Sequence, residues 1–346
     1  MVPRGGVCEI KIDIFNHVAP VSYLEMAEHY RPEWAAPLRR LKLLWDIEGR
    51  LQMLEQWPDL QQILTLTVPS LEYMAPLEQQ IDLAKAATDG MAEICRRWPD
   101  KFPYFIASLP MTDVPASLIE MDRAIEQLGA KGIQLQTSVD GRPLDHPDFL
   151  PVFERITNHH GLAIWLHPYR PISVPDYAAE DHSRFEVWQV LGWVYETSAC
   201  MARLVLSGLM DRLPAMRVIT HHCGGMLPYF AGRADTLWGL IGSRSPDPEY
   251  QAAQAVMDKQ SMSAWLKRFY GDTVLGGARA PLRCGLDFFG VDHVVLASDC
   301  PYGPESGRLF IREAIGSVED MNLSAEEKEK LYYGNAMALL RSNLIP

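Results

Sequence analysis

Short runs of apolar and β-branched residues recur along this chain of 346 residues, and helical patterns lie between most of them. Such runs are typical of buried strands, and strands that alternate with helices predict a parallel sheet with right-handed crossovers. Eight units of this kind close naturally into a (β/α)8 barrel, so the sequence predicts the α/β class. The strand candidates are CEIKIDIF, LQQILTLTV, KFPYFIASL, AKGIQLQTS, LAIWLH, MRVITHH, RFYGDTV and HVVLASD.

Two segments between strand candidates are too long for simple loops, namely residues 18–58 and 168–215. The second contains the helical pattern FEVWQVLGWVYETSACMARLVLSG. We interpret both as helical insertions, after the first and fifth strands, that cover the mouth of the barrel. No repeat, linker or low-complexity tract interrupts the chain, so residues 1–346 are expected to form a single domain.

The charge balance limits the classes of partner. The formal net charge is −12 at pH 7, which argues against nucleic acid or an anionic membrane as the main partner. The sequence contains no apolar run of about 18 residues that could span a membrane. Its first ten residues lack the apolar core of a secretory signal, and its cysteines are scattered rather than paired. Together these features predict a cytoplasmic protein with reduced thiols.

Histidines and one aspartate follow four different strand candidates. His17 follows the first, His167 ends the fifth, His221 and His222 end the sixth, and Asp299 ends the eighth. Because active-site groups of such barrels lie at the carboxyl ends of the strands, these side chains are expected to converge. Imidazoles with a carboxylate suit zinc, manganese or iron. A single histidine at a strand end is more often structural, but four strand ends together favour a site.

Seven pieces of the chain, spread from residue 12 to about residue 340, carry a family resemblance. The sequence resembles the amidohydrolase superfamily, in the branch of aminocarboxymuconate semialdehyde decarboxylase and the non-oxidative aromatic acid decarboxylases. This resemblance implies a distorted (β/α)8 barrel with one divalent metal, zinc or manganese. The matching pieces are IDIFNHVAP, WDIEGRLQMLEQWPDLQQILTL, LGAKGIQLQTSVDGRPLDHPDF, WLHP, ETSACMARLVLSGLMDRLPAMRVITHHCGGMLPYFAGR, VLASDCPYG and YYGNAMALL.

The resemblance also implies roles for particular residues. His17, His167 and Asp299 match metal ligands, and Asp299 also matches a catalytic group. His222 matches the histidine that acts as acid and base beside the metal, whereas we interpret the neighbouring His221 as structural. These assignments place the expected chemistry on four strand ends of the barrel.

Two arginines match residues that hold a substrate carboxylate in the decarboxylase. Arg50 is one, with a helix-surface charge as its alternative interpretation, and Arg233 is the other, contributed by a neighbouring subunit. A guanidinium grips a carboxylate through two parallel hydrogen bonds. A small-molecule carboxylic acid is therefore the expected substrate, and a homodimer or higher homo-oligomer the expected assembly.

The first strand departs from the family pattern at Phe15, where the family has histidine or glutamate. Phenylalanine cannot bind a metal, so the predicted site has one ligand fewer. Asp13 is expected to share the side of Phe15, because side chains alternate along a strand, and we interpret it as a structural acid deep in the barrel.

The leading hypothesis is a lyase that removes CO2 from an aromatic or unsaturated carboxylic acid. One alternative is a hydrolase or hydratase of the same superfamily, acting on a C–C, lactone or amide bond, possibly without metal. Another is a binding protein that has lost catalysis. Aromatic residues of the two long segments could wall a pocket for a flat substrate or simply form the core of those segments; they are Trp34, Trp45, Trp188, Trp193 and Tyr195.

Overall fold

The computed structural model describes residues 10–243 and 245–340, so the start of the first strand candidate, at Cys8, lies outside the described residues. Eight parallel strands in the described part of the chain coincide with the eight candidates. They are β1 (Lys11–Val18), β2 (Leu60–Leu66), β3 (Ala107–Ser108), β4 (Gly132–Gln136), β7 (Ala163–His167), β8 (Val218–Thr220), β9 (Tyr270–Asp272) and β10 (Val294–Val295).

The strands form a closed ring. Six of them lie in the order β10-β9-β8-β7-β4-β3, and β1 pairs with β2. A parallel bridge between Leu64 and Phe105 joins β2 to the segment that leads into β3. On the other side, the Ile14 amide donates to the Leu296 carbonyl at 2.9 Å, which joins β1 to the strand at β10. The predicted (β/α)8 barrel is therefore confirmed.

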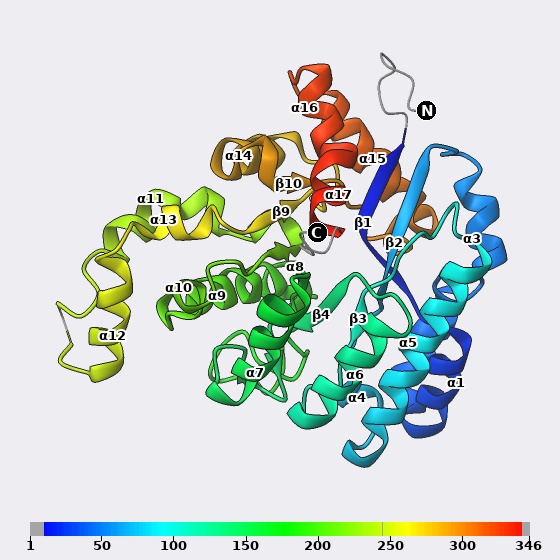
Figure 1. Ribbon diagram of the computed structural model, residues 1–346, viewed down its shortest axis with the longest axis horizontal. Coiled ribbons are helices and arrows are strands. Elements are labelled where there is room, and N and C mark those ends of the chain that lie inside the picture. Colours follow the sequence, from blue (N-terminus) through cyan, green and yellow to red (C-terminus); the bar gives the residue numbers. More distant parts are fainter. Residues whose placement is uncertain (1–9, 244, 341–346) are drawn as a thin grey trace.

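Helices lie around the strands (Figure 1). The segment from 18 to 58 is helical, and so is much of the segment from 168 to 215; the interpretation of both as insertions remains a prediction. The main helices are α1 (Val21–Tyr30), α2 (Pro32–Arg40), α3 (Ile47–Leu54), α4 (Leu71–Met74), α5 (Gln80–Arg97), α6 (Val114–Glu126), α7 (Leu150–Glu154), α9 (Gly192–Leu206), α11 (Leu227–Trp238), α12 (Pro248–Met257), α14 (Arg279–Phe289), α15 (Arg308–Glu319), α16 (Ala325–Glu329) and α17 (Asn335–Leu340).

Local sequence signals explain several helix ends. Ser324 and Glu327 form a capping box at the start of α16, as their spacing predicts. The helical stretch after α7 ends at Gly161, which has a left-handed backbone with φ 63° that glycine adopts without strain. No described helix is both long enough and apolar enough to cross a membrane.

Side chains fill the barrel interior. Trp165 on β7 is fully buried, and its indole Nε1 donates to the carbonyl of Ile14 on β1 at 2.8 Å. These two strands stand opposite each other in the ring, so this bond spans the barrel. Residues at the carboxyl ends of the strands therefore rest on a packed floor, as is usual for such barrels.

Candidate metal centre and active site

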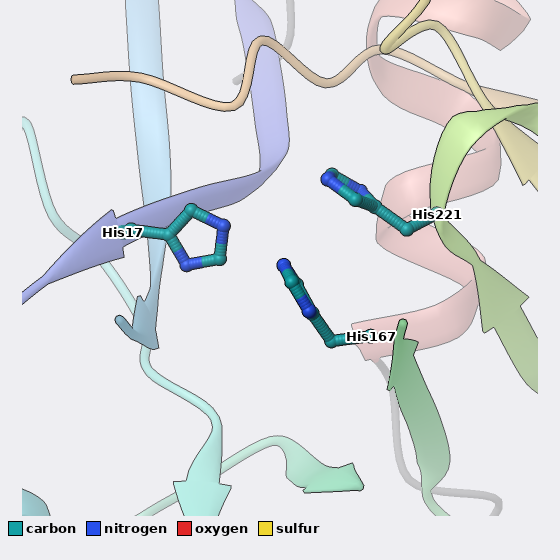
Figure 2. A group of neighbouring side chains, drawn as sticks. All are labelled: His17, His167 and His221. Carbon is teal, nitrogen blue, oxygen red and sulfur yellow. The ribbon is translucent and has the colours of Figure 1, made fainter. Parts of the chain in front are cut away.

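Three buried histidines converge at the carboxyl ends of the strands. His17 lies near the end of β1, His167 is the last residue of β7, and His221 follows β8 directly. One ring nitrogen from each lies within 4.8 Å of the others. Figure 2 shows the three imidazoles directed into one shared space from three separate elements. The predicted convergence of strand-end histidines is therefore present, with His221 as a member.

The second nitrogen of each ring is held by an oxygen. Nδ1 of His17 lies 3.2 Å from the Leu66 carbonyl, and Nδ1 of His167 lies 2.7 Å from the Pro168 carbonyl. Nδ1 of His221 lies 2.7 Å from Oδ2 of Asp272, the last residue of β9. In a neutral imidazole, an Nδ1–H that donates to an oxygen leaves Nε2 unprotonated, which is the form that binds a metal.

Asp299 supplies an oxygen to the same space. Its Oδ1 lies 3.1 Å from Nε2 of His17 and 3.6 Å from Nε2 of His221. Asp299 has a left-handed backbone with φ 64°, and its amide donates to the Phe15 carbonyl at 3.1 Å. The bend that follows β10 therefore turns the carboxylate toward the histidines.

The electrostatic environment separates these groups. Burial lowers the pKa of His167 well below its ordinary value, and the imidazoles of His221 and His17 lower it further. Burial also disfavours protonation of His221, but the carboxylates of Asp272 and Asp299 together raise its pKa to about 9. Burial would raise the pKa of Asp299, yet the imidazoles of His17 and His221 hold it well below its usual range. Asp299 is therefore ionised, and its negative charge favours a proton or a cation on the neighbouring imidazoles.

These residues fit a divalent metal. Nε2 of His17 and Nε2 of His221 are buried and make no well-aligned hydrogen bond among the described residues, although both face Oδ1 of Asp299. Buried nitrogens are normally satisfied, and a cation bound between these two nitrogens and the carboxylate would satisfy all three groups. Three imidazole nitrogens and one carboxylate oxygen form a donor set that zinc and manganese both accept.

Phe15 occupies the wall of this space. Its side chain is fully buried, and its ring centroid lies 4.4 Å from that of His221 and 5.8 Å from those of His17 and His167. The expected loss of a first-strand ligand is therefore real, because an apolar ring stands among the donors. His221, which we expected to be structural, adds a nitrogen to the same space.

A bulge in β1 changes the expected position of Asp13. The pairing register with β2 shifts between Asp13 and Asn16, so strict alternation fails there. Asp13 accepts hydrogen bonds from Gln62 and from both the amide and the hydroxyl of Ser298, whereas Phe15 packs against the histidine rings. Asp13 is the buried structural acid that we expected, but it does not share the surroundings of Phe15.

Arg50 does not fit its expected role in binding substrate. The side chain is fully buried on α3, and its guanidinium donates to Gln62, to Asn16 and to the main-chain carbonyl of His17. Because the side chain is fully buried and three of its N–H groups already donate to the protein, the guanidinium has no face open to a ligand. Arg50 therefore holds the end of β1, and the prediction of a carboxylate grip at this residue is corrected.

The other predicted site residues lie outside the group of four. The ring of His222 lies 4.2 Å from that of His221, and its buried Nδ1 has no partner among the described residues. Burial, with the neighbouring His221, lowers the pKa of His222 to about 4. Arg233 is exposed on α11 and lines a groove between α9 and α11, and none of the histidines lines this groove.

The sequence did not reveal the role of Asp272, and it led us to interpret His221 as structural although His221 belongs to the group of donors. Two adjacent histidines after a strand do not reveal which of them faces inward, because a turn decides this. Here His222 has a left-handed backbone with φ 54°, so the chain turns sharply after His221. The only available signal was the acid that ends the next strand, in the pattern YGD.

A model of the family described as amidohydrolase matches residues 12–342, which is nearly the whole chain. The chain belongs to the amidohydrolase family. Its donors at the carboxyl ends of β1, β7, β8 and β10 thus lie on a barrel of that family.

Among its relatives, the amidohydrolase resembles enzymes named as decarboxylases. It is 26% identical to the 2-amino-3-carboxymuconate-6-semialdehyde decarboxylase of Dictyostelium discoideum, with 96% of this chain and 91% of the relative covered. It is 27% identical to the gamma-resorcylate decarboxylase of a Polaromonas species, with 96% and 99% covered.

One solved structure supports the fold of this amidohydrolase. The 5-carboxyvanillate decarboxylase of Novosphingobium aromaticivorans, crystallised as a variant with manganese and a nitrobenzoic acid bound, aligns with a TM-score of 0.79. The sequences are 23% identical, and the alignment covers 96% of this chain and 97% of that one.

Proposed function

We propose that this amidohydrolase is a non-oxidative decarboxylase, a carbon–carbon lyase that removes CO2 from an aromatic or unsaturated carboxylic acid. The observation that carries the proposal is the convergence of His17, His167, His221 and Asp299 around one space that fits a divalent metal, zinc or manganese. The relatives that match nearly the full length of the chain bear the names of decarboxylases.

Loss of CO2 breaks a carbon–carbon bond and leaves an electron pair on carbon, and a proton must take the place of the carboxyl group. A divalent metal supplies Lewis-acid polarisation of a substrate oxygen when it is bound. Asp299, whose carboxylate faces the space between the histidines, is the first candidate to take a proton from an acidic group of the substrate and deliver it to the carbon. His222, whose low pKa keeps it neutral, is the second candidate for moving this proton.

Aromatic rings border the group of donors. The ring of Trp193 lies 5.6 Å from that of His167, and the ring of Tyr302 lies 5.4 Å from that of His17. Flat apolar surfaces beside a polar centre favour a planar substrate. This arrangement supports an aromatic or conjugated acid rather than a flexible aliphatic one.

A carboxylate grip from a second subunit completes the proposal. With Arg50 buried, the substrate carboxylate needs another partner, and Arg233 is the predicted one. The groove that Arg233 lines is largely apolar and includes the half-exposed rings of Tyr195 and Phe230. A contact between two copies across this surface would bury it, which supports a homodimer or a higher homo-oligomer.

The experiment is CO2 release by protein loaded with zinc or manganese, measured on a panel of hydroxybenzoic and unsaturated acids. We expect release of one CO2 per acid consumed, and Asp299→Asn should lower kcat at least a hundredfold. Asp258→Asn is a matched control because Asp258 is exposed at the end of α12, and it should leave the rate unchanged. Addition of water without loss of CO2 would instead identify a hydrolase or hydratase.

A further inference from the structure

A small polar recess lies beside the histidines, inside the mouth of the barrel. It is bordered by the carboxyl ends of β2, β3 and β4 and by α4, and it encloses about 30 Å³, room for one water-sized group. Thr67, Ser108, Gln134 and Gln136 are among its polar lining residues. The proposed chemistry at the histidines leaves the function of this recess unassigned.

Two buried amide oxygens in this recess lack hydrogen-bond partners. The side chains of Gln134 and Gln136 are 4% and 9% exposed, and Oε1 of each has no partner among the described residues. A buried carbonyl oxygen without a donor costs free energy, so it is normally satisfied in a native protein. Two such oxygens lining one recess indicate that a donor enters it.

The orientation of Gln134 is fixed by a neighbour. Its Nε2 donates to the Leu66 carbonyl at 3.1 Å, so its Oε1 is the free end of the amide. The same carbonyl accepts from Nδ1 of His17. Gln136 pairs in register with His167 on the neighbouring strand. Both glutamines therefore lie next to candidate metal ligands, Gln134 beside His17 and Gln136 beside His167.

The charges in the recess select the kind of group that it takes. Its lining residues include no lysine, arginine or histidine, and they include Glu72, whose pKa is raised by burial. Acceptor oxygens without a cation repel a carboxylate and attract a hydrogen-bond donor. The carboxyl group that is to be removed therefore does not enter the recess.

We propose that this recess binds a hydroxyl or amino substituent of the substrate, which donates its hydrogen bonds to the side-chain oxygens of Gln134 and Gln136. This inference rests on the proposed function for its setting, because it names the substrate class of the same site. The substrate is then a ring-substituted acid with a donor on the side that faces β4. A donor-free acid leaves both oxygens unpaired and binds more weakly.

Calorimetric binding to the metal-loaded full chain tests the proposal without requiring turnover. The probes are the three hydroxybenzoates and the three fluorobenzoates, because fluorine occupies similar space but donates no hydrogen bond. We expect one hydroxybenzoate to bind at least about tenfold more tightly than its fluoro partner. The absence of a preference at every position would show that the recess holds only water, and would overturn the proposal.

Two variants locate the preference. Gln134→Met and Gln136→Met keep the length of the side chain but remove the acceptor, and each should reduce the preference to about threefold or less while the fluoro acid keeps its affinity. If a methionine variant does not fold, Gln136→Asn is used in its place. Its side chain is one methylene shorter, so the oxygen is withdrawn from the recess and the preference should fall in the same way. Gln127→Met is the matched control, because Gln127 is exposed on the protein surface.

The outcomes separate this inference from the proposed function. If every folded recess variant keeps the preference for the hydroxybenzoate, the proposal that the recess binds this substituent is wrong, even if the protein releases CO2. A preference that disappears in the variants while no acid loses CO2 would support the recess and count against the decarboxylase.

Discussion

Nδ1 of His221 lies 2.7 Å from Oδ2 of Asp272, and both side chains are buried. Oδ1 of Asp272 meanwhile accepts from the amides of Cys223 and Val274, at 3.0 and 3.1 Å. The carboxylate is thus fixed by the main chain on one side and orients the imidazole on the other. This is the arrangement by which an outer carboxylate makes a histidine a stronger metal ligand.

Removal of that carboxylate should weaken metal binding. Asp272→Asn keeps the size of the side chain but loses its charge, and we expect the affinity for zinc or manganese to fall about tenfold to a hundredfold. Titration of the metal-free protein with each ion measures this directly. Asp258→Asn is the control, and equal affinities for the two variants would show that His221 is not a ligand.

The ring of Phe15 offers a gain-of-function test. In Phe15→Glu, a carboxylate would stand among the histidines, and without metal its burial should destabilise the protein by about 3 kcal/mol or more. Added zinc or manganese should then raise the melting temperature of this variant more than that of the wild type, because the new oxygen joins the donors. Phe15→Leu cannot ligate and should show only the wild-type increase. A metal response equal to that of Phe15→Leu would contradict the site geometry.

Arg50 should affect stability rather than substrate affinity. Arg50→Ala leaves Asn16, Gln62 and the His17 carbonyl without their buried donor, so we expect a loss of about 3 to 5 kcal/mol in the free energy of unfolding. Urea denaturation measures it. Arg40→Ala, at an exposed position of α2, should stay within about 0.5 kcal/mol of the wild type. A folded Arg50→Ala variant of normal stability with a raised KM would restore the substrate-binding role.

Asp13 should make stability depend on pH. Burial raises its pKa to about 6, although hydrogen bonds from Ser298 and Gln62 oppose the rise. The folded protein therefore holds this proton up to a higher pH than the unfolded chain does. The contribution of Asp13 to the free energy of unfolding is greatest below pH 4, and it falls as the pH rises from 4 to 6.

The comparison with Asp13→Asn isolates this effect. The variant has no proton to lose there, so the wild type should lose about 2 kcal/mol relative to it between pH 4 and pH 7. The free energy of unfolding of both proteins, measured across that range, checks the prediction. Parallel curves would mean that the carboxyl group is already ionised at pH 4.

Much of the fold was predictable because it depends on patterns of short range. Strand candidates, the capping box at Ser324 and the stop at Gly161 are local signals, and all three correspond to observed features. The convergence of His17, His167 and Asp299 was predictable as well, because barrel topology brings strand ends together.

The parts of the site that were missed depend on contacts between distant residues. Helical periodicity does not show that Arg50 points inward to Asn16 and Gln62, since the partners belong to other elements. The pairing of His221 with Asp272 joins residues 51 positions apart. The sequence does not show the turn at His222, so it does not reveal whether His221 or His222 faces the metal ligands.

The indole of Trp165, bonded to the Ile14 carbonyl on the opposite wall, has a consequence for ion choice. This hydrogen bond joins β1 and β7 three residues before His17 and two residues before His167. The distance between these two imidazoles is therefore set by the diameter of the barrel. Such a brace resists contraction around a smaller ion or dilation around a larger one. Selectivity among cations would then be a property of the scaffold as much as of the ligating atoms.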